Sequence, residues 1–240
     1  MPGGSAAESY VARPVDDGEH PGVLFFMDAI GLRPRIARMC QQIADWGYVV
    51  LAPNVFHRAG RVQDLEPTVD LRQPGEREAF FAKAMPRARG LTPELAEQDI
   101  PRYLAALRGL PGVTSGPVGA TGYCMGARLS LRSSGLDPGV AAVGGFHGGG
   151  LVTDSDDSPH LALQRARAEF VFLHADNDRS MPREAIEKLG HALEVAGLVA
   201  VNEVCPGAAH GYTMADTAMY DEAATERHFT ELEGLFGRAL

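Results

Sequence analysis

Six short apolar runs recur along the chain, each bounded by glycine, proline or polar residues. Runs of this length and composition are typical of strands buried on both faces of a sheet. They cover residues 22–28, 48–52, 117–123, 140–146, 169–175 and 199–204. The pattern therefore predicts six buried strands distributed over nearly the whole sequence.

The segments between these runs show helical signals. Over residues 34–46 the apolar side chains recur at the 3.6-residue spacing of an amphipathic helix, and Gly47 provides a stop. Thr92 and Pro93 have the types preferred at a helix cap and first turn, which predicts a helix that ends near Arg108. Further helices are predicted at residues 125–134, 182–196 and 216–238.

Alternating strands and helices predict an α/β fold, in which a mostly parallel sheet carries helices on both faces. We expect a single domain over residues 1–240. Residues 57–91 interrupt the alternation: they are rich in Arg, Pro and acids, with a short aromatic helical pattern at 76–85. We expect this excursion to cover the site, and the alternative is a solvated insertion without a role.

Composition narrows the possible partners. The 240 residues are 45% hydrophobic and carry a formal net charge of -9 without a long basic run, which argues against nucleic acid and favours a small molecule. The three cysteines form no C-x-x-C pair, which favours a reducing, cytoplasmic setting. Residues 1–13 lack a secretion signal, and no apolar stretch of about 18 residues predicts a membrane span. The oligomeric state stays open.

The strongest chemical motif is Gly122-Tyr123-Cys124-Met125-Gly126. It matches the G-x-S-x-G turn that holds a nucleophile between a strand and a helix in α/β-hydrolases, with cysteine in the serine position. Asp178 and His210 follow in the order that acid and base take in such enzymes. The alternative is that Cys124 is an inert, buried thiol.

The partners of Cys124 follow from the predicted strands. His210 lies after the last strand, where a general base can reach the sulfur. Asp178 fits the acid that orients it, with Asp176 as the alternative. The Met125 amide would provide half of an oxyanion hole, and the amide of Ala29 or Ile30, after the first strand, would provide the other half. His147 ends another strand and borders the pocket or packs beneath it.

Other motifs give little support to metal or nucleotide sites. His174, Asp176 and Asp178 alternate at a strand end, but no H-E-x-x-H motif accompanies them. The glycine-rich residues 144–150 lack both the G-x-G-x-x-G spacing and the lysine of a phosphate-binding loop. We expect neither a metal nor a cofactor.

Taken together, these segments resemble the dienelactone hydrolase family over nearly the full length. The similar stretches are Phe26-Met27-Asp28-Ala29-Ile30-Gly31-Leu32, residues 46–54, the cysteine elbow, Asp178 with Met181-Pro182, and Ala209-His210-Gly211-Tyr212. The resemblance implies an α/β-hydrolase that cleaves a small lactone or carboxylic ester through an acyl group on Cys124, with His210 as base and Asp178 as orienting acid.

The resemblance also suggests which residues surround the substrate. Asp28 stands where members carry a glutamate that contacts the resting thiol. Arg77 matches one of two arginines that hold the substrate carboxylate in the dienelactone enzymes, whereas Met214 occupies the place of the other. The resemblance further suggests substrate contacts for Tyr123, His147 and Tyr212. A less acidic ester or lactone is at least as good a candidate as a dienelactone.

Two other functions remain as alternatives to a cysteine hydrolase. The same fold and pocket could serve a protein that binds a small molecule without catalysis, because fold does not determine function. Cys124 could also be a redox sensor, although no resolving cysteine is near it in sequence.

Overall fold

The computed structural model describes residues 7–240, so the beginning of the segment in which we expected no secretion signal lies outside the described residues. One seven-stranded sheet runs through the molecule in the order β1-β3-β2-β4-β5-β6-β7. The strands are β1 (Ser9–Ala12), β2 (Gly22–Phe26), β3 (Val49–Pro53), β4 (Val118–Tyr123), β5 (Val140–Phe146), β6 (Glu169–Ala175) and β7 (Ala200–Cys205). Only β1 pairs antiparallel among these strands.

The predicted fold class is confirmed, and all six apolar runs are strands. The edge strand β1 was not predicted, because a four-residue strand with mostly exposed side chains has no apolar run to mark it. The strand β2 stops at Phe26, two residues earlier than predicted. Asp28 therefore belongs to the loop that follows the strand, which leaves its side chain free to bind neighbouring backbone groups.

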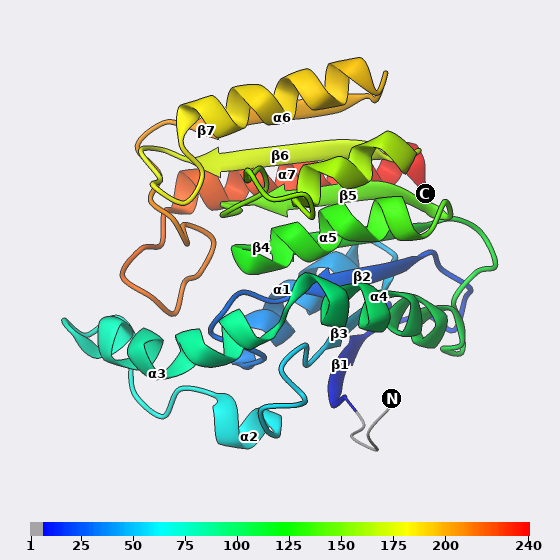
Figure 1. The fold of residues 1–240 in the computed structure, drawn as a ribbon. Helices are drawn as coiled ribbons and strands as arrows, with labels where there is room; N and C mark the ends of the chain where they lie inside the picture. Colours follow the sequence, from blue (N-terminus) through cyan, green and yellow to red (C-terminus); the bar gives the residue numbers. More distant parts are fainter. Residues whose placement is uncertain (1–6) are drawn as a thin grey trace.

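Helices cover both faces of the sheet (Figure 1). They are α1 (Pro34–Asp45), α2 (Val62–Leu65), α3 (Glu76–Gly90), α4 (Pro93–Arg108), α5 (Met125–Leu136), α6 (Arg183–Val195) and α7 (Glu222–Ala239), with a 3-10 helix η1 at Pro159–Arg165. In Figure 1, α1 and α7 lie behind the sheet, whereas α4, α5 and α6 lie in front. None of the helices within residues 7–240 is long and apolar enough to cross a membrane.

Two segments differ from the prediction. The last helix begins at Glu222 rather than near residue 216, because the Asp221 side chain caps it by accepting a hydrogen bond from Ala224 N at 2.9 Å. The predicted aromatic pattern at 76–85 belongs to the longer helix α3, which continues through Pro86 to Gly90. In Figure 1, α3 projects to the left, the side toward which the arrow of β6 points. The excursion thus extends at the edge where ligands of parallel sheets bind.

Candidate active site

Cys124 occupies a sharp turn between β4 and α5. Its backbone has φ 54° and ψ −117°, a conformation that non-glycine residues rarely adopt. Such strain persists only where the surrounding structure holds the residue in place. Here the glycines on either side of Cys124 allow the surrounding backbone to pack closely enough to do so. A Cβ on Gly122 would lie 2.1 Å from the Gly126 oxygen, and one on Gly126 would lie 2.4 Å from the Phe26 oxygen. Glycine at both positions lets the turn close against the neighbouring strand.

Three side chains meet in a hydrogen-bonded row at this turn. The Nε2 atom of His210 lies 3.0 Å from the Cys124 sulfur, and its Nδ1 atom lies 2.6 Å from Asp178 Oδ2. The Asp178 side chain is 7% exposed and that of His210 is 26% exposed, so water reaches the imidazole more than the carboxylate. The geometry is that of a nucleophile, a base and an orienting acid.

The charges of Cys124, His210 and Asp178 shift one another's pKa values. Burial opposes a charged imidazole, but the Cys124 sulfur and the Asp178 carboxylate together raise the pKa of His210 to about 10. Burial likewise raises the pKa of the Cys124 thiol, yet the charge and hydrogen bond of His210 outweigh it, so the net pKa of that thiol is lowered. The sulfur and the imidazole therefore each favour the charged form of the other.

The two carboxylates after β6 have different partners. Asp178 Oδ1 accepts hydrogen bonds from the Ser180 amide at 2.8 Å and from its hydroxyl at 2.7 Å, which turns Oδ2 toward His210. Asp176 instead accepts a hydrogen bond from Gly207 N at 2.9 Å. Asp176 therefore anchors the loop before His210, and the geometry favours Asp178 as the orienting acid.

Within the described residues, the loop after β2 contributes one backbone amide without an acceptor to the cavity beside Cys124. Ile30 N donates to the Asp28 side chain at 3.1 Å, so the expectation of an oxyanion donor at Ile30 is corrected to Ala29. The Ala29 amide has no acceptor among residues 7–240, and Ala29 lines a cavity together with Cys124 and Met125. The first amide of α5, that of Met125, lies beside the sulfur and helps to lower the pKa of the thiol.

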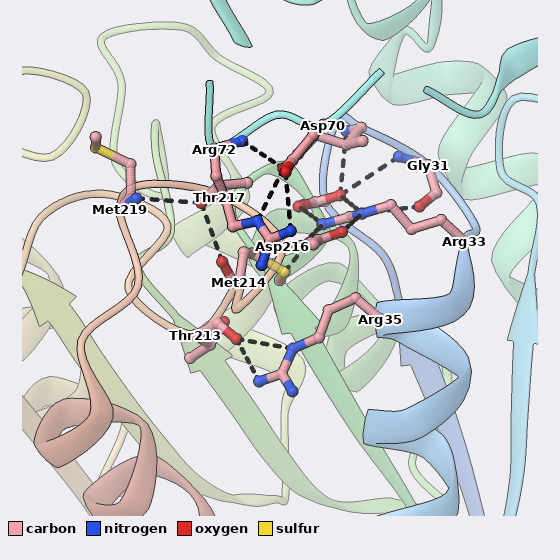
Figure 2. A network of polar contacts seen from close by, with 12 residues as sticks. Gly31, Arg33, Arg35, Asp70, Arg72, Thr213, Met214, Asp216, Thr217 and Met219 are labelled. Atoms are coloured by element: carbon pink, nitrogen blue, oxygen red, sulfur yellow. Dashed lines mark hydrogen bonds and ion pairs between the residues drawn. The ribbon is translucent and has the colours of Figure 1, made fainter. Parts of the chain in front are cut away.

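A buried arginine that we did not predict holds the Asp28 loop (Figure 2). Arg33, at the start of α1, donates to Asp28 at 2.7 and 3.0 Å and to the Gly31 carbonyl at 3.0 Å. Its other donors reach Asp216 at 2.5 Å and the Met214 sulfur at 3.2 Å. Arg33 thereby joins the loop after β2 to the loop that follows His210. No hydrogen bond joins Asp28 to the Cys124 sulfur; both line one small cavity, and the Asp28 charge raises the pKa of the thiol.

The reacting groups open into a cavity of about 640 Å³. Cys124 and His210 form part of its wall, and α3 contributes Arg77 and Phe81. The excursion therefore reaches the site. Within it, the Arg77 guanidinium lies 4.7 Å from the centre of the Phe81 ring. Arg87, also on α3, donates to the Ile30 carbonyl at 2.8 Å and ties the helix to the Asp28 loop.

Of the three further residues expected to contact substrate, only His147 borders a cavity beside Cys124. Tyr123 and Tyr212 are fully buried and line none of the cavities beside Cys124; their expected substrate contact is corrected to packing. The Tyr123 hydroxyl lies 2.8 Å from His228 Nε2, and the Tyr212 hydroxyl donates to the Leu173 carbonyl at 3.1 Å. His147 borders the small cavity edge-on to His210, and burial and the charge of His210 hold its pKa well below the usual value.

The other two cysteines, Cys40 and Cys205, differ from Cys124 in their surroundings. Cys40 and Cys205 are both buried, and burial raises the pKa of each thiol, which makes them poor resolving partners for a redox-active Cys124. Within residues 7–240, no group of three or more His, Cys, Asp or Glu side chains is arranged to hold a metal ion.

The chain is similar to several carboxymethylenebutenolidases. The chain is 24% identical over 234 residues to a candidate carboxymethylenebutenolidase of Synechocystis sp., covering 95% of this chain and 89% of that protein. It is 26% identical over 189 residues to the carboxymethylenebutenolidase of Rhodococcus opacus, covering 78% and 68%.

Solved structures agree on the fold. A candidate dienelactone hydrolase of Klebsiella pneumoniae superposes with a TM-score of 0.79 at 21% identity, covering 97% of this chain and 93% of the other. The model of the dienelactone hydrolase family matches residues 7–240. Family membership supports a hydrolase role, and the chain belongs to the dienelactone hydrolase family.

Proposed function

We propose that this protein hydrolyses a small carboxylic ester or lactone through a thioester on Cys124. The observation that carries the proposal is the row from Asp178 through His210 to Cys124, with separations of 2.6 and 3.0 Å at a strained turn. Family membership and the names of the relatives, which are carboxymethylenebutenolidases, support the same class of reaction.

In the first step the Cys124 thiolate attacks the carbonyl carbon of the substrate. The carbonyl oxygen becomes an oxyanion that the amides of Ala29 and Met125 stabilise. As the tetrahedral intermediate collapses, the carbon–oxygen bond of the ester breaks and the proton on His210 Nε2 passes to the departing alkoxide. In a lactone, that alkoxide stays attached to the acyl chain. The product of this half-reaction is a thioester on Cys124.

In the second step water replaces the alcohol. The neutral His210 accepts a proton from the water as its oxygen attacks the thioester carbon, and Asp178 stabilises the imidazolium that results. Collapse of the second intermediate breaks the carbon–sulfur bond, releases the carboxylic acid product and restores the thiolate–imidazolium pair. The two steps use three side chains, two backbone amides and water.

A panel of small aryl esters and unsaturated lactones tests this function. The wild type and Cys124→Ala would be compared under reducing conditions, with product release followed by absorbance. We expect turnover of at least one ester or lactone and its loss in Cys124→Ala. Equal turnover by both proteins would show that Cys124 is not the nucleophile. Tight binding without turnover of any compound would favour a non-catalytic binding protein.

A further inference from the structure

Arg128 is a cation in the site wall that the proposed reaction does not use. It lies in the first turn of α5, four residues after Cys124, which precedes the helix. It lines the 640 Å³ cavity together with Cys124 and His210. Its guanidinium makes no hydrogen bond or ion pair with any side chain or backbone group of residues 7–240.

A second cavity adjoins the first at Arg128. It has a volume of about 140 Å³ and is bounded by Leu91, Thr92 and the beginning of α4. Ala88, Met125, Arg128 and Gly150 line both cavities, so Arg128 stands where they meet. A ligand seated on Cys124 can therefore extend past the guanidinium into this recess.

The other charged groups around the recess already have partners. Arg132 donates to Glu97 at 2.7 Å and to the backbone carbonyl of Asp157. The Asp157 carboxylate accepts a hydrogen bond from the Ser155 hydroxyl. Among the described side chains that line the recess, Arg128 is thus the cation whose donors remain available.

Arg77 is less available than Arg128. Its guanidinium packs over the Phe81 ring, and one of its nitrogens lies 3.9 Å from a Glu78 carboxylate oxygen. Arg128 lacks such a neighbour, and partial burial lowers its pKa, although the Cys124 charge raises it. Burying a cation without a partner is unfavourable, and an anionic group on a ligand would relieve that penalty.

We propose that Arg128 is a specificity-determining residue that binds a carboxylate on the acyl part of the substrate. The inference rests on the proposed hydrolase function and extends it to acidic esters and lactones. The planar guanidinium offers paired donors that match a carboxylate. Because Arg128 and Cys124 line the same cavity, an acyl chain of a few carbons attached to the sulfur can bring its carboxylate to the guanidinium.

Alkylation of Cys124 tests the anion site without requiring turnover. Iodoacetate and iodoacetamide have nearly the same shape and differ in charge, so the ratio of their rate constants reports the preference for an anion. We expect this ratio to fall about tenfold in Arg128→Met, because one charge-assisted contact of this kind contributes about a factor of ten or more. Arg128→Lys should retain part of the ratio. Arg89→Met, which removes an exposed arginine from α3, should leave it unchanged.

An unchanged ratio in Arg128→Met would overturn the proposal. The thermal unfolding of each variant would be measured beside the alkylation rate constants. If Arg128→Met folds poorly, the ratio in Arg128→Lys tests the proposal instead. Because Cys40 and Cys205 are buried, peptide mass spectrometry can assign the label to Cys124.

Two matched esters then test the acyl assignment: 4-nitrophenyl hemiglutarate, which carries a carboxylate, and 4-nitrophenyl valerate, which is neutral. We expect kcat/KM for the hemiglutarate to fall about tenfold in Arg128→Met while that for the valerate changes less than about twofold. An equal effect on both esters would overturn the assignment to the acyl part. If the wild type hydrolyses neither ester nor any compound of the panel, the hydrolase function fails, while the alkylation ratio still decides whether Arg128 forms an anion site.

Discussion

Asp28 and Arg33 are joined by two hydrogen bonds, of 2.7 and 3.0 Å, in a part of the site where their side chains are only 5% and 2% exposed. Both oxygens of the Asp28 carboxylate therefore bind an arginine, and no hydrogen bond joins them to the Cys124 sulfur. This arrangement is consistent with a thiolate that depends on His210 for its charge partner. Because Arg33 also binds Asp216, the pair connects the oxyanion loop with the loop that carries His210.

Loss of this pair is predicted to destabilise the protein strongly. Arg33→Met leaves the Asp28 carboxylate buried without its main cationic partner, and breaking a buried ion pair in this way costs about 3–5 kcal/mol. The free energy of unfolding from denaturant titration measures the effect. The exposed pair of Arg72 with Asp70, whose side chains are 62% and 37% exposed, provides the control. Arg72→Met should change the free energy of unfolding by less than about 1 kcal/mol, and equal losses in the two variants would contradict this account.

The two aspartates after β6 are predicted to differ in catalysis. Asp178→Asn removes the charge that orients and stabilises the His210 imidazolium, and kcat should fall by about 10³ to 10⁴. Asp176→Asn should lower kcat less than about tenfold, because its carboxylate accepts a hydrogen bond from Gly207 and none from His210. Steady-state kinetics on one aryl ester compares the two. A larger loss in Asp176→Asn would assign the orienting acid to that residue.

The thiol of Cys124 is predicted to react at unusually low pH. Since His210 lowers its pKa, iodoacetamide should alkylate it below neutral pH faster than it alkylates free cysteine, and the pH profile should show a midpoint below the ordinary value of 9.0. In His210→Ala the midpoint should move upward, because the charge and hydrogen bond of the imidazole no longer oppose the effect of burial. Identical midpoints in the two proteins would mean that the pair does not set the thiol's charge.

Acid is predicted to remove the stability that Asp178 provides. Burial opposes its charge, but the hydrogen bond and charge of His210 lower its pKa from 3.8 to about 2 in the folded protein. The folded state therefore binds fewer protons than the unfolded state between these values. The contribution of Asp178 is complete above its unfolded pKa and disappears as the pH falls through about 2. Unfolding free energies of wild type and Asp178→Asn should converge from about pH 5 to 2, and a constant difference would exclude this linkage.

The elbow glycines are predicted to tolerate no side chain. A Cβ on Gly126 would lie 2.4 and 2.5 Å from the carbonyl oxygens of Phe26 and Met27, so Gly126→Ala must push α5 away from β2. We expect a loss of about 3 kcal/mol or more in the free energy of unfolding. The helical Gly237 has nothing within 4 Å of such a Cβ, so Gly237→Ala should be neutral or stabilising by up to about 1 kcal/mol. Similar stabilities of the two variants would contradict the close approach.

The sequence predicted those features that local patterns determine. Continuous apolar runs indicated the six central strands, and the glycines around Cys124 indicated the turn, because a buried strand and a tight elbow each leave a local signature. The edge strand β1 has too few buried residues to leave one. The loop before α7 was expected to be helical, since helix periodicity does not reveal that Asp221 caps the helix later.

Contacts between distant segments could not be predicted in the same way. Arg33 and Asp216 are 183 positions apart and meet only because β2 and the loop after β7 share one edge of the sheet. Arg128 has the sequence signature of an ordinary helix residue, and only the cavities on either side of it distinguish it. The turn from Asp178 to Ser180 did carry a local signal, because an aspartate followed two residues later by serine favours an Asx turn.

The most direct test of the central claim is the mass of the protein during turnover. The wild type would be mixed with an activated aryl ester, quenched in acid within seconds, digested and examined by mass spectrometry beside Cys124→Ala. We predict an acyl group on the peptide that contains Cys124, lost as hydrolysis finishes, and no adduct in the variant. Full turnover by Cys124→Ala, or an acyl group that forms only at another residue, would contradict a thioester mechanism at Cys124.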